Sequence, residues 1–390
     1  MRKCSPNWVD TYVDHTRHTN PPTAYHTWTA LSVLASTLQR NLYLPRGFYK
    51  LFPNLYICLI GPTGFAKTTA ADIGINRFLE PVLPMDQLIR GKATSWFLYD
   101  WFGKRTASKA PCVCTIYSGE MKNLLGDLNK TELVTLLTDL YTSPDKTAYH
   151  TKTGTNFQLH NVAINMLTCS TPEWLTTGTT TDEISGGFTG RFVYVFADTG
   201  DSSIAFPEDY LTPDVLALGT DLLDDLKHIA TLKGVFIITD QAKAEYIVWY
   251  SNRKQEWNDE RLIGYYARKG DLVLKLSMLL SISRDSTLVI DECILTLAWT
   301  LLKQLEKSMA GAFVGVVDDP VLRYKDLVLG QISRAPGHSA ARSEILKKNW
   351  NRFDGLVLDR IVTNLIETRT IRSESITIGK ETEVCYKLRD

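Results

Sequence analysis

The sequence predicts an α/β fold: a largely parallel sheet flanked by helices, then a helical region and a small C-terminal unit. Two observations lead to this fold class. Short apolar runs typical of buried strands alternate with helical segments, and one of these runs ends in a glycine-rich loop that leads directly into a helix. The 390 residues are enough for two or three folding units.

The sheet is predicted from four apolar runs that follow an N-terminal helical segment, residues 1–50, which contains a helix over 28–40. The predicted strands span residues 54–60, 112–117, 162–168 and 192–196. The predicted helices between them span residues 67–78, 94–102 and 130–141. Because strands and helices alternate, crossover connections make the strands parallel, and we expect an α/β core over residues 51–205.

Helical patterns dominate after residue 205. A helical lid, residues 206–310, is predicted from helices over 212–230, 240–256, 260–284 and 291–310 and a strand over 235–239. The unit 320–390 resembles a winged helix, with helices over 322–334, 340–350 and 356–368, strands over 371–378 and 384–388, and a wing at Gly379. Lys and Arg exceed Asp and Glu by four in this unit, a basic excess that suits DNA phosphates but is also compatible with a protein partner.

Charge and cysteine usage exclude several protein classes. Lys plus Arg and Asp plus Glu are each 43, so no whole-molecule field attracts the chain to nucleic acid or to a membrane, and a polyanion site must be local. The seven cysteines lack C-x-x-C spacing and most lie in apolar stretches, which predicts reduced thiols and a cytoplasmic protein of a bacterium or a virus-infected host. No run of about 18 apolar residues occurs, so we expect no membrane contact.

The strongest chemical signal is the segment Gly61–Thr69, GPTGFAKTT, between a predicted strand and a predicted helix. A phosphate chain is bound by inward-pointing backbone N–H groups, a helix N-terminus, a lysine and a hydroxyl that ligates Mg²⁺. Lys67 would contact the β- and γ-phosphates and Thr68 would ligate the metal, while Gly61 and Gly64 permit the sharp turn. A turn that only joins strand to helix is the alternative.

Ala66 stands where such loops usually have glycine. A loop with Ala before the Lys resembles the Walker A motif of the MCM (minichromosome maintenance) helicases, a branch of the AAA+ ATPases, and the loops of replicative helicase-like ATPases of phages and mobile elements. Over about residues 7–280 the resemblance implies an AAA+ P-loop NTPase that binds ATP and Mg²⁺. Its nucleotide-binding residues would be Gly61, Gly64, Ala66, Lys67, Thr68 and Thr69.

The predicted strand Val113–Glu120 resembles a Walker B strand. Such strands usually end in Asp-Glu, where the Asp holds Mg²⁺ and the Glu polarises the attacking water. Here Gly119 replaces the Asp, so Glu120 is the candidate catalytic carboxylate and Ser118 would support the metal. The alternative for Glu120 is a carboxylate that only favours the start of the next helix. The missing Asp also leaves slow or absent hydrolysis open.

Residues 147–160 predict a β-hairpin with Lys152 at its tip. MCM-type helicases insert a hairpin just before the sensor-1 strand, and its tip faces the central channel. The resemblance therefore implies that Lys152 contacts the phosphates of single-stranded DNA, although a solvated lysine on an exposed hairpin is the alternative. In the C-terminal unit, Lys347 and Lys348 are the candidate DNA-binding residues.

Three further roles follow from the resemblance. Ser170 or Thr171, at the carboxyl end of a buried strand, resembles sensor 1, unless these hydroxyls only cap the following turn. Arg191, in a Gly-Arg-Phe segment, would be the arginine finger that acts on a neighbouring subunit's nucleotide, or else a surface residue that opens a strand. Arg268 resembles the sensor-2 arginine and shares a seven-residue spacing with Arg261 and Lys275, which are otherwise a solvated helical face.

Together these features predict an ATP hydrolase that forms a ring, a hexamer, and acts as a DNA helicase or translocase on single-stranded DNA. It would serve the replication of a virus or mobile element, with replication proteins as partners. The alternative is a non-motor AAA+ switch that assembles on DNA with ATP and recruits a recombination or replication partner. A protein-remodelling AAA+ machine, stimulated by polypeptide instead of DNA, is the third possibility.

Overall fold

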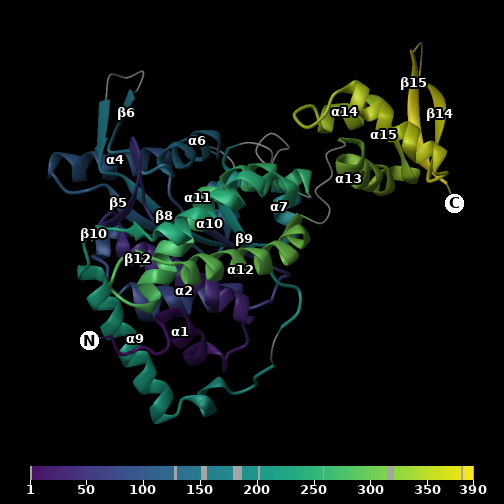
Figure 1. Ribbon diagram of the computed structural model, residues 1–390. Coiled ribbons are helices and arrows are strands. Elements are labelled where there is room, and N and C mark those ends of the chain that lie inside the picture. The colour runs from purple at the N-terminus through teal and green to yellow at the C-terminus, as the bar shows by residue number, and fades with distance from the viewer. Residues whose placement is uncertain are drawn as a thin grey trace. The chain divides into compact units, whose positions relative to one another are not determined.

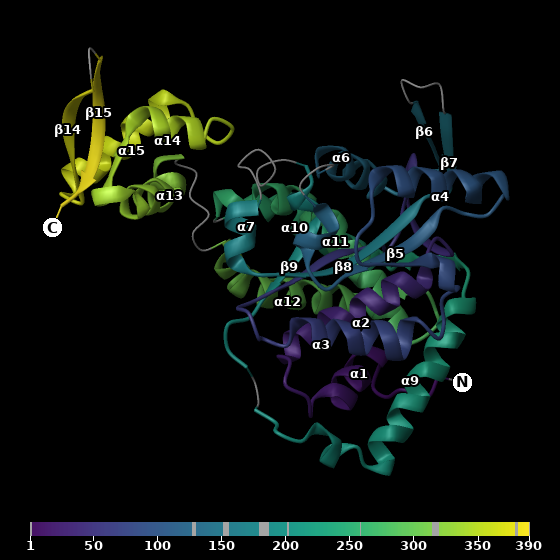
Figure 2. The same cartoon turned by 180° about the vertical axis from the view of Figure 1, so that it is seen from behind.

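The computed structural model divides the chain into two compact units, Met1–Val314 and Gly315–Asp390, drawn in Figures 1 and 2. The described residues are 2–126, 130–150, 156–178, 187–200, 203–257, 259–313, 320–378 and 381–389. Among them, no helix combines the length and the apolar character needed to cross a membrane. The three segments predicted before residue 310 all belong to the first unit.

Two helices and a β-hairpin precede the sheet. α1 (Trp8–Thr16) begins at Asn7, whose side chain accepts a hydrogen bond from the Asp10 N–H. α2 (Thr23–Leu38) confirms the helix predicted over 28–40. β1 (Leu42–Arg46) and β2 (Tyr49–Leu51) pair as an antiparallel hairpin. The N-terminal segment 1–50 therefore holds a β-hairpin besides its helices, and the chain reverses at Gly47, whose φ of 63° suits a tight turn.

The sheet of the first unit has five parallel strands in the order β4-β5-β8-β3-β9, which confirms the α/β class. The four predicted strands correspond to β3 (Tyr56–Ile60), β5 (Val113–Ser118), β8 (Ala163–Ser170) and β9 (Phe192–Phe196). Every residue of β3 is buried, as expected for an inner strand with continuous apolar sequence. The edge strand β4 (Leu88–Arg90) was not predicted, because three residues are too few to form a recognisable run.

Helices flank this sheet. α3 (Lys67–Asp72) continues into a π-helical segment, Ile73–Leu79, and together they confirm the helix predicted over 67–78. α4 (Ser95–Ala107) and α6 (Lys130–Leu140) also match predicted helices, whereas α5 (Met121–Leu125) and α7 (Pro172–Gly178) are short additions. In Figures 1 and 2, α2 and α3 lie on one side of the sheet and α6 on the other.

A β-hairpin lies between α6 and β8 in the chain, where the sequence predicts it. β6 (Lys146–His150) and β7 (Asn156–His160) pair antiparallel. The stacked rings of Tyr99 and Tyr149, 3.8 Å apart, join the hairpin to α4. Lys152 lies outside the described residues.

The region after residue 205 contains the predicted helices. They are α9 (Pro213–Thr231), α10 (Asp240–Asn252), α11 (Ile263–Arg284) and α12 (Glu292–Met309). Two short strands of this region, β11 (Ile237–Ile238) and β12 (Val289–Ile290), pair with each other. A third, β10 (Gly234–Val235), pairs with β1 in the N-terminal part of the chain. The Asp225 carboxylate on α9 accepts hydrogen bonds from the Arg2 side chain and from the Lys3 and Cys4 N–H groups, which ties these helices to the chain start.

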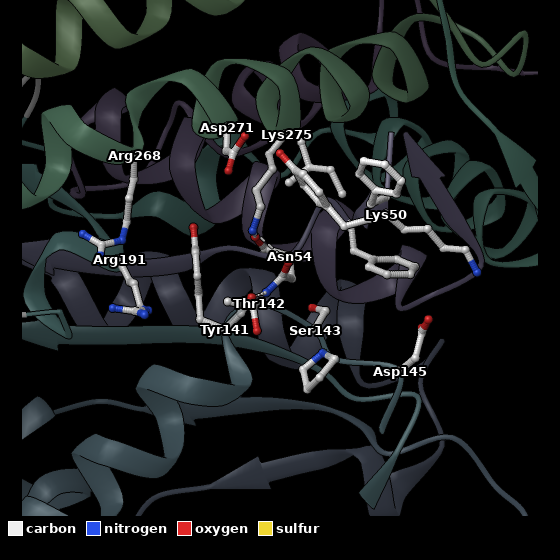
Figure 3. A pocket seen from close by; sticks show the side chains of 15 residues that line it. Lys50, Asn54, Tyr141, Thr142, Ser143, Asp145, Arg191, Arg268, Asp271 and Lys275 are labelled. Atoms are coloured by element: carbon white, nitrogen blue, oxygen red, sulfur yellow. Dashed lines mark hydrogen bonds between the residues drawn. The ribbon is translucent and has the colours of Figure 1, made fainter. Parts of the chain in front are cut away.

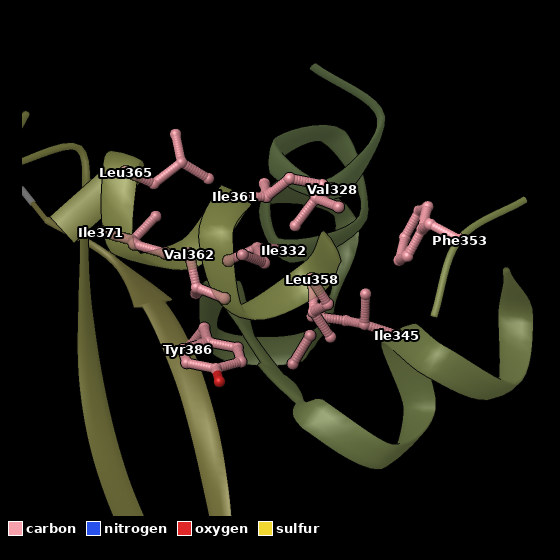
Figure 4. Packing of buried hydrophobic residues seen from close by; sticks show 11 residues of the cluster. Val328, Ile332, Ile345, Phe353, Leu358, Ile361, Val362, Leu365, Ile371 and Tyr386 are labelled. Carbon is pink, nitrogen blue, oxygen red and sulfur yellow. The ribbon is translucent and has the colours of Figure 1, made fainter. Parts of the chain in front are cut away.

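Within its described residues, the second unit has three α-helices and a three-stranded antiparallel sheet. The helices are α13 (Pro320–Arg334), α14 (Arg342–Lys348) and α15 (Gly355–Glu367), and the strands are β13 (Ser339–Ala341), β14 (Ile371–Ile378) and β15 (Glu381–Leu388). Figure 4 shows the apolar core between them, which includes Val328, Leu358, Leu365 and Tyr386. The order of elements agrees with the prediction, and Gly379 lies outside the described residues.

A buried polar network fixes the amino end of β3. The Lys275 amine on α11 donates to the backbone carbonyl (2.9 Å) and the side-chain oxygen (2.8 Å) of Asn54. The Asn54 amide in turn donates to the carbonyl oxygens of Tyr141 and Ile164. A neutral amine has two N–H donors, which is the number that the two Asn54 acceptors require.

Replacing Lys275 by Met tests this network through pH. Burial lowers the pKa of the Lys275 amine from 10.5 to about 7. Between these values the unfolded chain holds a proton that the folded chain lacks, so the stability contributed by Lys275 rises with pH. We expect the free energy of unfolding of the wild type to increase, relative to that of Lys275→Met, from about pH 7 to about pH 10. Denaturant titrations of both proteins measure the difference, and a constant difference would contradict the prediction.

Candidate functional site

The loop between β3 and α3 has a backbone that few residue types allow. A Cβ atom at Gly61 would lie 2.4 Å from Tyr25 Oη and 2.5 Å from the carbonyl oxygen of Ala197, both far inside contact distance. Gly64 and Ala66 have positive φ values, 82° and 51°. Glycine adopts this conformation freely, whereas an L-residue such as Ala loses roughly 1–2 kcal/mol in it. The loop is therefore held in a compact turn at the carboxyl end of β3.

Backbone N–H groups of this loop are available to an anion. Within the described chain, no protein acceptor receives a hydrogen bond from the N–H groups of Gly64, Ala66, Lys67 or Thr68. Successive N–H groups in a turn that leads into a helix form a concave site that binds phosphate. The loop thus offers the donors that the sequence predicted for it.

The Lys67 amine lies against the same loop. It donates hydrogen bonds to the carbonyl oxygens of Gly61 (2.7 Å) and Pro62 (2.6 Å). Burial lowers the pKa of Lys67, an effect that the nearby carboxylates of Glu173 and Glu120 partly oppose. A lysine held at the turn, with carboxylates around it, is in the position from which it can contact the outer phosphates of a nucleotide.

A cavity of about 460 Å³ opens at the carboxyl ends of β3, β5 and β8. Its lining brings together six predicted residues, Gly64, Lys67, Thr68, Glu120, Ser170 and Thr171. The chain leaves β3 toward the edge strand β4 and leaves β8 toward β9 at the opposite edge, so the cavity lies where the direction of the connections reverses. In open α/β sheets this topological switch point is the usual ligand site. Gly61, Ala66 and Thr69 shape the loop or its helix without lining the cavity.

Glu120 is exposed at the N-cap position of α5, where its side chain forms no capping hydrogen bond. The carboxylate lines the cavity instead. Its neighbour Ser118 is buried outside the cavity lining and donates its hydroxyl to the backbone carbonyl of Glu120 at 2.7 Å. A Cβ atom at Gly119 would lie 3.3 Å from Thr68 Cγ2, so a larger residue at position 119 would crowd the threonine.

The oxygen atoms in the cavity fit a magnesium ion that is shared with phosphates. Among the described residues, no group of three or more His, Cys, Asp or Glu side chains is arranged to hold a metal. Mg²⁺ usually takes one or two protein oxygens and completes its shell with phosphates and waters. The hydroxyl of Thr68 and the carboxylate of Glu120 provide such a donor set.

Ser170 and Thr171 differ in their local bonding. The Thr171 hydroxyl oxygen accepts the Trp174 N–H at 3.3 Å, so it already stabilises the first turn of α7. The Ser170 hydroxyl donates only a long hydrogen bond, 3.4 Å, to the carbonyl of Thr171. Of the two, Ser170 has the hydroxyl that is more available to a ligand.

The two predicted arginines lie at a second cavity, of about 490 Å³, shown in Figure 3. Arg191 donates to the carbonyl oxygen of Gly187, and Arg268 donates to that of Gly264 at 2.8 Å. Neither guanidinium forms an ion pair with a described carboxylate. Burial, together with the nearby charge of Arg268, lowers the pKa of Arg191. Neither arginine lines the Lys67 cavity.

The three residues with seven-residue spacing, Arg261, Arg268 and Lys275, lie in two different environments. Arg268 and Lys275 both line the second cavity, with Asp271 between them. Arg261 precedes α11 and forms an ion pair with Asp259 at 2.7 Å. The expected shared face therefore holds for two of the three residues.

Several contributors to the first cavity were not predicted. Glu173 and Trp174 line it from α7, and Lys122 lines it from α5. Tyr25 supports the start of the β3–α3 loop, because its hydroxyl donates a hydrogen bond to the carbonyl oxygen of Ile60 at 2.6 Å. The sequence carries no signal for Tyr25, because it lies far from the loop in the chain and its role depends on the packing of α2.

The predicted DNA-binding residues belong to other segments of the chain. Lys347 and Lys348 are exposed in the last turn of α14, in the second unit. Lys152 falls between the two described strands of the β6–β7 hairpin and outside the described residues.

Ala66→Gly tests the backbone of the loop. Glycine removes the steric cost of the left-handed conformation, which exceeds the extra chain entropy that glycine loses on folding. We expect the free energy of unfolding to rise by up to about 1 kcal/mol. Thermal or denaturant unfolding measures the change, with Ala107→Gly near the end of α4 as a control that should destabilise. A less stable Ala66→Gly protein would show that this loop conformation is not the one adopted.

Comparison with protein-family models finds no match to this chain, and comparison with curated protein sequences finds none either.

Proposed function

We propose that the chain is a P-loop ATPase of the AAA+ type that forms a ring, a hexamer, and moves along single-stranded DNA. One observation carries this proposal: Lys67, Thr68, Glu120 and Ser170 meet in one cavity at the switch point of a parallel sheet, directly beside a loop with unused N–H donors. These are the groups that phosphoryl transfer from a magnesium-bound nucleotide requires.

Each side chain has a distinct role in the proposed reaction. The loop N–H groups and the Lys67 amine bind the phosphates, and the Thr68 hydroxyl would hold Mg²⁺, which neutralises charge on the phosphate oxygens. The Glu120 carboxylate orients the attacking water, because it is exposed and forms no cap on α5. The Ser170 hydroxyl contacts the γ-phosphate. Thr171 keeps α7 in place through Trp174.

The arginines supply the argument for a ring. Stabilising the transition state calls for a guanidinium on the γ-phosphate, and no described arginine lines the Lys67 cavity. Arg191 and Arg268 are held together at a different cavity without carboxylate partners. A head-to-tail contact between copies would bring this pair to a neighbour's nucleotide, and such contacts form a ring when the rotation between neighbouring copies closes.

DNA is the proposed track. The β6–β7 hairpin has the position in the chain at which the helicases it resembles carry a channel-facing hairpin, with Lys152 in its connecting segment. The second unit has the element order of a winged helix and a basic excess. ATP hydrolysis at the ring interfaces would move the hairpins along the strand during replication, together with replication proteins.

A non-motor ATP switch is the second candidate, and Gly119 favours it. With glycine at position 119, the metal would lack the aspartate that related sites use, which would slow hydrolysis. Measuring ATP hydrolysis with and without single-stranded DNA, beside a strand-separation assay, distinguishes the two. ATP-dependent assembly without strand separation would select the switch.

Lys67→Ala tests the nucleotide site. Removal of the amine eliminates the charge that faces the outer phosphates, so we expect ATP affinity to fall about 100-fold or more. Titration with a fluorescent ATP analogue measures the affinity, and Lys243→Ala, on the exposed face of α10, is the matched control. ATP binding by Lys67→Ala equal to that of the control would end the proposal.

Mixing two inactive variants tests the ring. We expect Arg191→Ala and Glu120→Gln each to lose hydrolysis about 10³-fold or more. In an equal mixture, about a quarter of the interfaces would pair an intact Glu120 with an intact Arg191 from another copy, so activity should partly return. A mixture of Arg191→Ala with the double variant has no such interface and should stay inactive. No recovery in the first mixture would contradict a shared site.

A further inference from the structure

The turn after α14 presents a tryptophan to solvent. Trp350 has 81% of its surface exposed, although a tryptophan normally buries most of its large ring. No described aromatic ring or cation packs on it within residues 320–378 and 381–389. Single exposed apolar side chains are common on protein surfaces, so the exposed ring has to be considered together with the charged residues beside it.

The residues on either side hold this turn rigidly. Asn349 is buried, and its amide donates to the carbonyl oxygen of Ile345 (2.7 Å) and to the side-chain oxygen of Gln331 (3.0 Å). Phe353 is buried in the core of the unit (Figure 4), and its ring packs on that of Tyr324. Because both ends of the turn are anchored, the backbone at Trp350 is fixed before binding, and only the side-chain torsions of the ring remain to be ordered by a partner.

Cations flank Trp350 in the chain. Lys347 and Lys348 precede it and Arg352 follows it, and all three are exposed. Among the described residues, no carboxylate forms an ion pair with any of them. Positive charges on both sides of a single aromatic residue suit a strand in which phosphates and flat bases alternate.

The third helix of the unit does not offer an alternative DNA surface. Asp359, Thr363 and Glu367 recur every four residues along α15 and are exposed, so one face of the helix carries two carboxylates. Arg342 pairs with Asp359 at 3.0 Å, and Arg360 follows Asp359 on the same helix. Carboxylates repel phosphates, so this face is unsuited to lie in the groove of a duplex.

We propose that Trp350 is a base-stacking platform for single-stranded DNA, with Lys347, Lys348 and Arg352 contacting the adjacent phosphates. This inference deepens the proposed function and rests on its DNA track, but it assigns a second contact in a different unit from the hairpin. The contact is independent of sequence, because every base has a face that can stack on the indole.

Binding of labelled oligodeoxythymidylate by the full chain, without nucleotide, tests the platform by fluorescence anisotropy. We expect Trp350→Ala to weaken binding about 5-fold or more, and Trp350→Phe to keep most of the affinity. Leu356→Ala is the matched control, because this nearby residue is also exposed and apolar, at 75%. The affinity of Leu356→Ala should equal that of the wild type.

A strand of the same length without bases separates stacking from charge. Wild type and Trp350→Ala should bind the abasic strand equally, whereas Lys347→Ala combined with Lys348→Ala should weaken binding of both strands and reduce its salt dependence. Equal binding of the thymidylate strand by wild type and Trp350→Ala would overturn the inference and leave a protein partner for this surface. Failure of the wild type to bind any strand would instead reject the DNA track of the proposed function.

Discussion

The fixed position of β3 is the constraint on which the first unit depends. At its amino end, the buried Lys275–Asn54 pair connects α11 to the strand and to the two segments beside it. At its carboxyl end, Gly61 leaves no room for a side chain between Tyr25 and Ala197. With both ends held, β3 cannot slide against β8 and β9, and the loop that follows it keeps its shape. The N–H donors and the Lys67 amine are preorganised for the same reason.

Local sequence patterns were sufficient for most of the fold. A short window of sequence is enough to recognise the apolar runs of β3, β5, β8 and β9. The same holds for the helical periodicity of the long helices after residue 205. β4 was missed because it has only three residues and its partner β5 lies elsewhere in the chain, and the β1–β2 hairpin was missed because its two strands are short and carry no continuous apolar run. The packing of the later helices on the N-terminal part likewise rests on long-range contacts, such as those of Asp225, which no periodicity reveals.

The candidate site also has residues that the sequence could predict and residues that it could not. Lys67, Thr68 and Glu120 follow buried strands directly, so their meeting at one edge of a parallel sheet could be predicted. The pairing of Arg191 with Arg268 could not, because the two residues come from distant segments that meet only after the helices pack. Trp350 was also missed, since its exposure depends on the burial of Asn349 and Phe353 on either side of it.

The contact of Tyr25 with the β3–α3 loop limits how the chain can be divided into fragments. The Tyr25 hydroxyl contacts both the last carbonyl of β3 and the carbonyl that follows β9, so the β3–α3 loop is supported by a helix that precedes the sheet in the chain. A fragment cut out at residue 51, or a chimaera that exchanges only the sheet and its loops, would discard this support. A recombinant of two related chains would therefore have to take α2 and β3 from the same parent.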